Sequence, residues 1–190
     1  MLNILVCIKQ VIDPEMPSSA FSINTSSKKV EEPDGIPPVI NGFCENAVEA
    51  ALRIKDVSDA NITILSIGNK FVTEVMKKPL SMGADELILI EGPEFENLDP
   101  LSTVNVLRAA IQKLGSFDLI LCGRQASDWD NALVPLGLSE MLDFPCITIG
   151  QKIEIVDQGL IVQRTLSNGY EIVESSLPAL VTVTNELGDP

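Results

Sequence analysis

Asp118-Leu-Ile-Leu-Cys122, followed at once by Gly123-Arg-Gln-Ala-Ser-Asp-Trp-Asp130, is the stretch of this 190-residue chain that decides the fold. An apolar run short enough to be a buried strand breaks at a glycine into a polar loop, and the loop leads into a segment with helical spacing. In an open α/β sheet, ligands bind in the crevice beyond the carboxyl ends of the strands. We therefore expect the functional site at this loop.

Three more apolar runs of strand length accompany it, and all are continuously apolar, which is typical of parallel strands covered on both faces. They span Leu2–Ile8, Asn61–Ile67 and Glu86–Ile90. The segments between these runs have the apolar spacing of helices, over residues 45–55, 71–76, 101–114 and 131–142. Pro79 and Gly115 are stop signals for the second and third helices. The alternation predicts an α/β fold with a doubly wound, mostly parallel, Rossmann-like sheet.

Two segments depart from this alternation. Residues 14–38 are rich in Pro, Ser and Lys and predict an insertion with a short hairpin. Residues 151–185 predict a meander of β-hairpins, with a turn at Asp157–Gly159 and a last strand at Leu177–Thr184. We expect residues 1–190 to form a single domain, which is long enough to bury a sizeable core.

The net charge of −14, from 27 acidic and 13 basic residues, limits the partners. Such a field repels phosphates, so we expect no nucleic-acid binding. It is compatible with a solvated acidic surface or with docking onto basic patches of partner proteins. No apolar run approaches the roughly 20 residues needed to span a bilayer. No leader peptide is visible, so we expect a cytoplasmic location without membrane insertion.

The cysteine and histidine content limits the chemistry. Cys7, Cys44, Cys122 and Cys146 are far apart in the sequence, and there is no histidine. A zinc site would need all four thiolates together, so we expect no metal site. The absence of histidine also excludes a Ser-His-Asp or Cys-His nucleophile. We expect Cys7 and Cys122 to be buried, reduced core residues, and we assign no catalytic residue.

Three strand ends converge in this topology, at Val6–Pro14, at Leu65–Gly68 and at the Gly123 loop. Gly123 lets backbone approach a ligand closely. The segment Asn41–Glu45 enters the first helix, where free N–H groups favour an anion. These are the parts of a nucleotide pocket. Because no Walker A run and no G-x-G-x-x-G follows a strand, the nucleotide is expected to be held rather than hydrolysed.

Several residues near this pocket have more than one interpretation. Lys9 is either a solvated residue or one with a structural or binding role. Asp128 and Asp130 are compatible with a binding loop and with simple turn and N-cap positions. Trp129, the only tryptophan, either stacks on a base, contacts another subunit or lies at the rim.

Five motifs in order resemble the beta subunit of electron transfer flavoprotein. Ile4-Leu-Val-Cys-Ile-Lys-Gln-Val-Ile-Asp13 is similar to the family's first strand and its Lys-x-Val-x-Asp turn. Asn41-Gly-Phe-Cys-Glu45 resembles its Asn-Pro-Phe-x-Glu helix entry, with Gly42 in place of Pro. Met82-Gly-Ala-Asp85 and the loop Gly123–Asp130 match its Met-Gly-Ala-Asp turn and its Gly-(Arg/Lys)-Gln-Ala-x-Asp-x-Asp loop, and residues 177–183 fit its closing strand.

The resemblance implies a sheet of the adenine-nucleotide-binding type and a beta-type subunit that pairs with a flavin-carrying alpha subunit. Such a subunit is an electron carrier rather than an enzyme, and it shuttles electrons from or to dehydrogenases. The bound cofactor is AMP or FAD. The residues that correspond to the family's pocket, together with Lys9, are Cys7, Lys9, Asn41, Gly42, Phe43, Cys44, Ile67, Gly123, Arg124, Gln125, Ala126, Ser127, Asp128, Asn131, Ala132, Leu133 and Val134.

The sequence departs from the family in two places. Ala132–Pro135 stands where the family shows Gly-Gln-x-Gly or Asn-Gln-Thr-Gly, so Leu133 replaces a side-chain amide and Pro135 has no N–H to donate. Losing one charge-assisted hydrogen bond costs on the order of 1.5–3 kcal/mol. The backbone N–H groups of residues 132–134 remain available. Family members continue past Pro190 with an arm that embraces the alpha subunit, and we expect this chain to lack that arm.

Two other classes compete with this interpretation. One is a stand-alone nucleotide-binding protein of the universal-stress type, whose Gly-x-x-Gly-x(9)-Gly-(Ser/Thr) phosphate loop this sequence lacks. The other is a nucleotide alpha-hydrolase-like enzyme that uses Asp128 and Asp130 with a metal ion.

Overall fold

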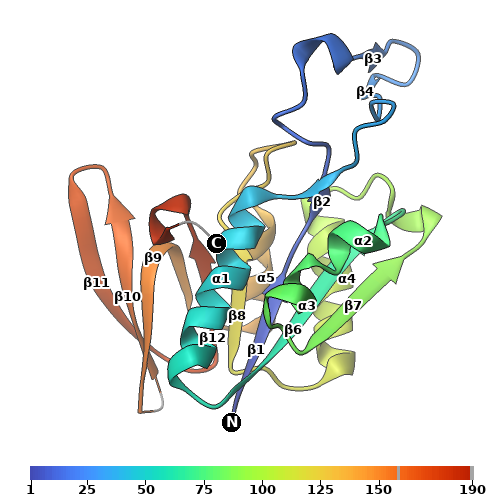
Figure 1. Cartoon of the computed structure of the whole chain (residues 1–190). Coiled ribbons are helices and arrows are strands. Elements are labelled where there is room, and N and C mark those ends of the chain that lie inside the picture. The colour runs from blue at the N-terminus through green and yellow to red at the C-terminus, as the bar shows by residue number, and fades with distance from the viewer. Residues whose placement is uncertain (158, 189–190) are drawn as a thin grey trace.

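An eight-stranded sheet forms the centre of the computed structural model, which describes residues 1–157 and 159–188 (Figure 1). Its strands are β1 (Leu2–Cys7), β6 (Ala60–Gly68), β7 (Glu86–Glu91), β8 (Leu119–Gly123), β9 (Cys146–Val156), β10 (Gly159–Leu166), β11 (Gly169–Ser176) and β12 (Ala179–Val183). Their order is β11-β10-β9-β12-β8-β1-β6-β7. Gln158, within the predicted turn at Asp157–Gly159, and the last two residues of the chain lie outside the described residues.

Helices cover both faces of the parallel part of the sheet. The helices are α1 (Gly42–Val57), α2 (Thr73–Met76), α3 (Lys78–Met82), α4 (Pro100–Leu114) and α5 (Val134–Leu142), with 3-10 turns η1 (Ser18–Ala20), η2 (Pro93–Phe95) and η3 (Asn185–Leu187). One core cluster packs α1, α2 and α3 against one face, and a second packs α4 and α5 against the other. The doubly wound α/β class is therefore confirmed. None of the described helices is both long and apolar enough to cross a bilayer.

The four apolar runs form the parallel strands β1, β6, β7 and β8, as predicted. Side chains on both faces of β1 and β8 are buried, which explains why these runs are apolar throughout. The helix after Pro100 also ends before Gly115 as predicted. Its N-cap Asp99 accepts a hydrogen bond from the N–H of Ser102 over 2.7 Å.

The start of α5 was predicted three residues too early. The sequence pattern gave a helix from Asn131, whereas α5 begins at Val134. Asp130 and Ala132 have φ values of 51° and 53°, which lie in the left-handed region and cannot belong to a right-handed helix. Pro135 therefore lies in the first turn of α5, where its missing N–H costs nothing.

The C-terminal meander extends the same sheet. β9, β10 and β11 pair antiparallel as successive hairpins. β9 begins at Cys146, five residues before the predicted meander of residues 151–185, and its first residues pair in parallel with β12. β12 returns from the meander to lie between β9 and β8, so the last strand of the chain is buried near the sheet centre.

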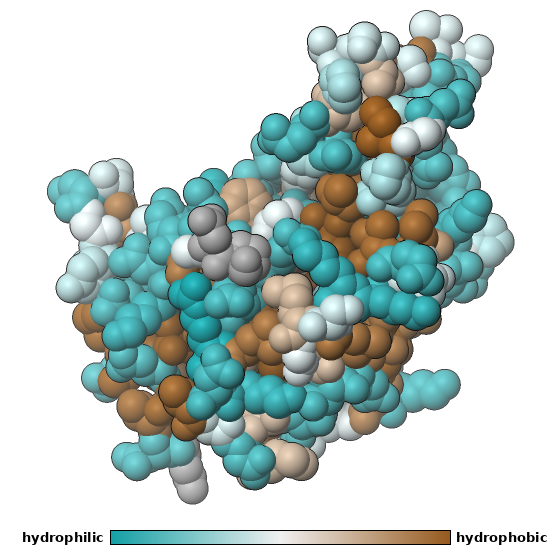
Figure 2. All heavy atoms as spheres, viewed as in Figure 1, coloured by the Kyte–Doolittle hydropathy of each residue, from teal (hydrophilic) through white to brown (hydrophobic). Residues whose placement is uncertain are grey.

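Residues 14–38 form an arm that projects beyond the carboxyl edge of the sheet (Figure 1). The arm leaves and returns through β2 (Gln10–Val11) and β5 (Val39–Ile40), and it contains the hairpin of β3 (Ile23–Asn24) and β4 (Lys29–Val30). Lys29 Nζ pairs with Glu96 Oε1 over 2.7 Å. This ion pair connects the arm to the segment between β7 and α4. On the face that Figure 2 shows, hydrophobic residues gather below the arm within a largely hydrophilic surface.

Candidate functional site

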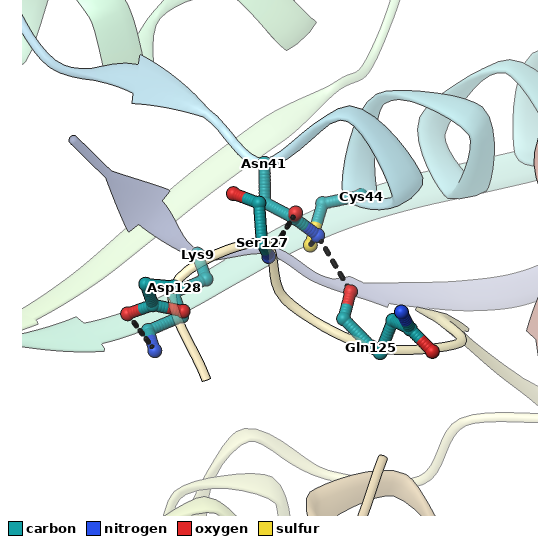
Figure 3. Close-up of polar contacts among 6 residues, drawn as sticks. All are labelled: Lys9, Asn41, Cys44, Gln125, Ser127 and Asp128. Atoms are coloured by element: carbon teal, nitrogen blue, oxygen red, sulfur yellow. Dashed lines mark hydrogen bonds and ion pairs between the residues drawn. The ribbon is translucent and has the colours of Figure 1, made fainter. Parts of the chain in front are cut away.

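Asn41, the residue before α1, joins that helix to the loop after β8. It is 1% exposed, and its Nδ2 donates to the carbonyl oxygen of Gln125 over 2.9 Å. Its Oδ1 accepts a hydrogen bond from the backbone N–H of Ser127 over 3.1 Å (Figure 3). A carboxamide both donates and accepts, so one side chain satisfies a carbonyl group and an N–H group of the loop. We call this pair of contacts the Asn41 clamp.

The backbone around Asn41 brings the end of β1 to the same place. The N–H of Asn41 donates to the carbonyl oxygen of Lys9 over 2.9 Å. The carbonyl oxygen of Asn41 accepts from the N–H of Cys44 over 2.8 Å and so begins α1. The end of β1, the start of α1 and the loop after β8 therefore meet at one buried residue.

The loop after β8 is also fixed by bonds of its own. Gln125 Nε2 donates to Asp130 Oδ1 over 2.8 Å, and the N–H of Asp130 donates to the carbonyl oxygen of Ala126 over 2.8 Å. The N–H of Arg124 donates to the carbonyl oxygen of Val183 over 3.0 Å, which connects the loop to β12. The loop thus has a defined conformation.

Two cations lie beside the clamp. Lys9 Nζ pairs with Asp128 Oδ2 over 2.6 Å, so Lys9 connects the end of β1 to the loop (Figure 3). The Arg124 guanidinium carbon lies 5.3 Å from the centre of the Phe43 ring, at cation–π distance. Both predicted binding residues therefore have structural partners as well as positive charge near the strand ends.

Gly123 packs closely against the backbone of Phe43 in the first turn of α1. A Cβ at this position would lie 2.6 Å from the carbonyl carbon of Phe43 and 2.8 Å from its carbonyl oxygen. The first turn of α1 can therefore approach the end of β8 only if residue 123 is glycine. The close approach predicted for Gly123 is found, and its partner in the structure is α1.

Backbone N–H groups supply the donors that a phosphate needs. Within the described part of the chain, no hydrogen bond uses the backbone N–H of Ala132, Leu133 or Val134. These groups precede or begin α5, where helix N-termini favour anions. Pro135 follows and has no N–H, and Leu133 has no side-chain donor. These backbone donors therefore fit a phosphorylated ligand.

Only some of the predicted pocket residues contact one another in the structure. Lys9, Asn41 to Cys44 and residues 123–128 form one connected set through the contacts above. Cys7 lies on β1 beside Cys122 of β8. Ile67, near the carboxyl end of β6, and Val134 pack against the core cluster on the α4–α5 side. Asn131 and Leu133 are exposed, and no hydrogen bond between described residues connects Ile67 or Asn131 to the clamp.

The suggestion that Asp128 and Asp130 cap a helix is wrong. The N-cap of α5 is Leu133, whose own side chain makes no capping hydrogen bond. Asp128 instead pairs with Lys9, and Asp130 accepts from Gln125. Asp130 was not among the predicted pocket residues, although it follows Gln125 within the quoted loop. Val183 was also missed, because it contributes only a backbone carbonyl, which no side-chain pattern reveals.

The four cysteines have free thiols. Cys122 is buried as predicted, whereas Cys7 is half-buried. A hydrogen bond with Cys7, followed by burial, raises the pKa of the Cys122 thiol well above its usual value. Burial raises the pKa of Cys44 and of Cys146. These three thiols are therefore protonated at neutral pH. Among residues 1–157 and 159–188, no group of three or more His, Cys, Asp or Glu could hold a metal ion.

Comparison with known proteins identifies the family. The model of the electron transfer flavoprotein domain matches residues 32–190. The chain is 38% identical over 189 residues to the electron transfer flavoprotein subunit beta of Thermoanaerobacterium thermosaccharolyticum, covering 100% of this chain and 70% of that protein. It is 36% identical over 190 residues to the caffeyl-CoA reductase-Etf complex subunit CarD of Acetobacterium woodii, covering 100% and 71%. It is 36% identical over 196 residues to the electron transfer flavoprotein subunit beta of Megasphaera elsdenii, with the same coverage.

The fold and the strand-end loop define an α/β protein with a candidate site at the carboxyl edge of its sheet. The chain belongs to the electron transfer flavoprotein family, and its role is that of a beta-type electron transfer subunit. The resemblance found in the five sequence motifs is confirmed.

Proposed function

We propose that this chain holds an adenine nucleotide, AMP or FAD, at the carboxyl edge of the sheet and pairs with a flavin-carrying alpha subunit. The pair shuttles electrons from or to dehydrogenases, and the chain itself is an electron carrier rather than an enzyme. It acts in the cytoplasm as one nucleotide-binding domain over residues 1–190. The Asn41 clamp is the observation that carries the proposal, because it fixes the loop next to two helix N-termini.

Each part of the pocket has its own task in this proposal. The backbone N–H groups of Ala132, Leu133 and Val134 bind the phosphate, and Lys9 supplies positive charge nearby. The Asn41 clamp positions the loop from Gly123 onward, so that the donors are in place before the ligand arrives. Preorganisation of this kind lowers the entropy that binding costs. When FAD is bound, its flavin supplies the redox chemistry, and the protein supplies position and shape.

The hydrolase alternative has less support. Asp128 and Asp130 are both occupied, by Lys9 and by Gln125 respectively. A metal-binding role would require both carboxylates to leave these partners. The family match also favours a carrier over a stand-alone protein of the universal-stress type.

Native mass spectrometry of the purified chain tests the nucleotide, and coexpression with the alpha subunit of the same organism tests the pairing. We expect one equivalent of AMP or FAD on the chain and a yellow complex with the alpha subunit. A chain that neither retains nor takes up AMP or FAD would contradict the nucleotide site. A nucleotide-loaded chain that forms no complex would contradict the pairing alone.

A further inference from the structure

Exposed large apolar side chains lie at the N-terminal ends of α4 and α5 and on the candidate loop that leads into α5. Trp129 is 73% exposed, Leu101 62%, Leu133 53% and Leu136 43%. We call these four residues the apolar rim. Exposed apolar residues on monomers are normally scattered singly, so a group next to a candidate site indicates contact with another molecule.

The packing of the two helices places the rim residues at one end of the helix pair. A Cβ on Gly137 of α5 would lie 3.1 Å from Val104 Cγ2 of α4, so the helices touch at this point. Leu101 and Leu133 each lie about one turn before that contact, at the carboxyl edge of the sheet. Leu136 adjoins the contact, and Trp129 lies on the loop that leads into α5.

The segments that carry the rim are rich in carboxylates and poor in cations. The segments 91–107 and 125–151 contain no Lys or Arg. Their acidic residues are Glu91, Glu94, Glu96, Asp99, Asp128, Asp130, Glu140 and Asp143. Among the described residues, lysines from other segments pair with two of the eight, Glu96 and Asp128. Glu140 and Asp143 lie toward the C-terminal end of α5, so the other six are the carboxylates nearest the rim. The nearest cation that α4 itself carries is Arg108, about two turns beyond Leu101.

This charge pattern favours some binding partners of the rim and disfavours others. A second copy would bring two acidic surfaces together on chains of net charge −14. Nucleic acid and anionic membranes are repelled for the same reason. A different protein with an apolar centre and a rim of Lys and Arg is complementary to it.

We propose that the apolar rim is the docking surface for the flavin-carrying alpha subunit, through a basic-edged apolar patch on that subunit. The inference rests on the proposed pairing and adds where the pairing occurs. Docking at the rim places the partner directly over the loop Gly123–Val134, beside the nucleotide. Trp129, as a large and exposed aromatic residue, is expected to carry the largest share of the binding energy.

The test compares two variants of the chain for binding to the alpha subunit of the same organism. The first combines Leu101→Gln, Trp129→Gln and Leu136→Gln, which leaves the proposed nucleotide-binding residues in place. The matched control combines Tyr170→Thr and Ile172→Thr, which removes two exposed apolar residues of β11, on the distant edge of the sheet. Kd is measured by biolayer interferometry at about 50 and 500 mM NaCl, and nucleotide content by mass spectrometry.

We expect the triple variant to weaken binding by about 100-fold or more with unchanged nucleotide content, and the control to stay within about threefold. High salt is expected to weaken the wild-type complex. A triple variant that binds like the wild type would overturn the proposal while leaving the pairing intact. A wild-type chain that carries nucleotide but forms no complex would overturn both.

Hydrogen–deuterium exchange of the wild-type pair gives a second readout that does not depend on the variants. We expect protection at residues 98–108 and 126–140 when the alpha subunit binds. Protection confined to β11 would overturn the proposal. So would a dimer of the chain alone that the triple variant abolishes, because it would assign the rim to a second copy.

Discussion

Asn41 Nδ2 lies 2.9 Å from the carbonyl oxygen of Gln125, across 84 residues of sequence, in a position that is almost wholly buried. Most N-cap asparagines use their side chain to cap their own helix. Asn41 does not cap α1 with its side chain and uses its carboxamide to hold the loop after β8. The geometry of the candidate site therefore depends on this residue.

Asn41→Ala is expected to weaken AMP or FAD binding by about 5- to 150-fold. The change leaves the carbonyl group of Gln125 and the N–H of Ser127 without partners, which costs about 1–3 kcal/mol. Isothermal titration calorimetry measures the affinity. Asn46→Ala is the matched control, since Asn46 is buried in α1 and donates to Gly188 rather than to the loop. An Asn41 variant that loses stability like the control but binds nucleotide normally would contradict the positioning role.

Gly123→Ala is expected to destabilise the fold by about 1–3 kcal/mol, because its Cβ would meet Phe43 backbone at 2.6 Å. Gly42→Ala is the control on the same junction. Among the described residues, no non-local atom lies within 4 Å of a Cβ at position 42, and alanine favours the helix by up to about 1 kcal/mol. Urea unfolding measures both variants. Equal stability of the two would show that the junction can relax, contrary to this account.

Leu133→Gln is expected to raise the affinity for AMP by about tenfold, because it supplies a side-chain amide next to the backbone donors of α5. Leu133 is half exposed, so the polar side chain has little folding cost. Leu136→Gln changes the same residue type one turn along α5 and should leave AMP binding unchanged. Calorimetry distinguishes them, and a gain with Leu136→Gln instead would place the phosphate elsewhere.

Asp85→Asn is expected to destabilise the protein by about 0.5–1 kcal/mol at neutral pH, after allowance for solvent screening. A hydrogen bond from Lys55, followed by one from the N–H of Ile62, lowers the pKa of Asp85 below its usual value. A carboxyl whose pKa is lowered by folding stabilises the protein above its unfolded pKa, and this contribution is lost as the pH falls through the folded pKa. Thermal unfolding from pH 7 down to pH 2 should show the two proteins converging in acid. A constant difference across that range would contradict the assignment.

Much of the fold was predictable from local signals. A glycine marks the end of β8, and Pro100 and Gly115 mark the start and the end of α4. These residues act through backbone geometry alone, so their effect can be recognised in the sequence. The position of β12 between β9 and β8 was not predictable, because it depends on long-range pairing after a three-strand excursion. The start of α5 was misjudged because the positive φ of Ala132 leaves no signal in residue type.

The candidate site was also predictable only in part. The motifs identified the loop and the helix entry, because polar residues and glycine mark the ends of buried strands. The partners within the site were not predictable. Asp128 and Asp130 were equally good helix caps by sequence, and only the folded loop brings one to Lys9 and the other to Gln125.

The most direct test of the central claim is a titration of the ¹⁵N-labelled chain with AMP and with FAD, followed by amide chemical shifts. The account predicts saturable shifts at residues 41–44 and 123–134 with at least one of the two nucleotides. If neither nucleotide shifts these amide signals, the account is contradicted. It would also be contradicted by shifts at the amino edge of the sheet, around the cavity of about 340 Å³ that Asn3, Asn61 and Thr63 line.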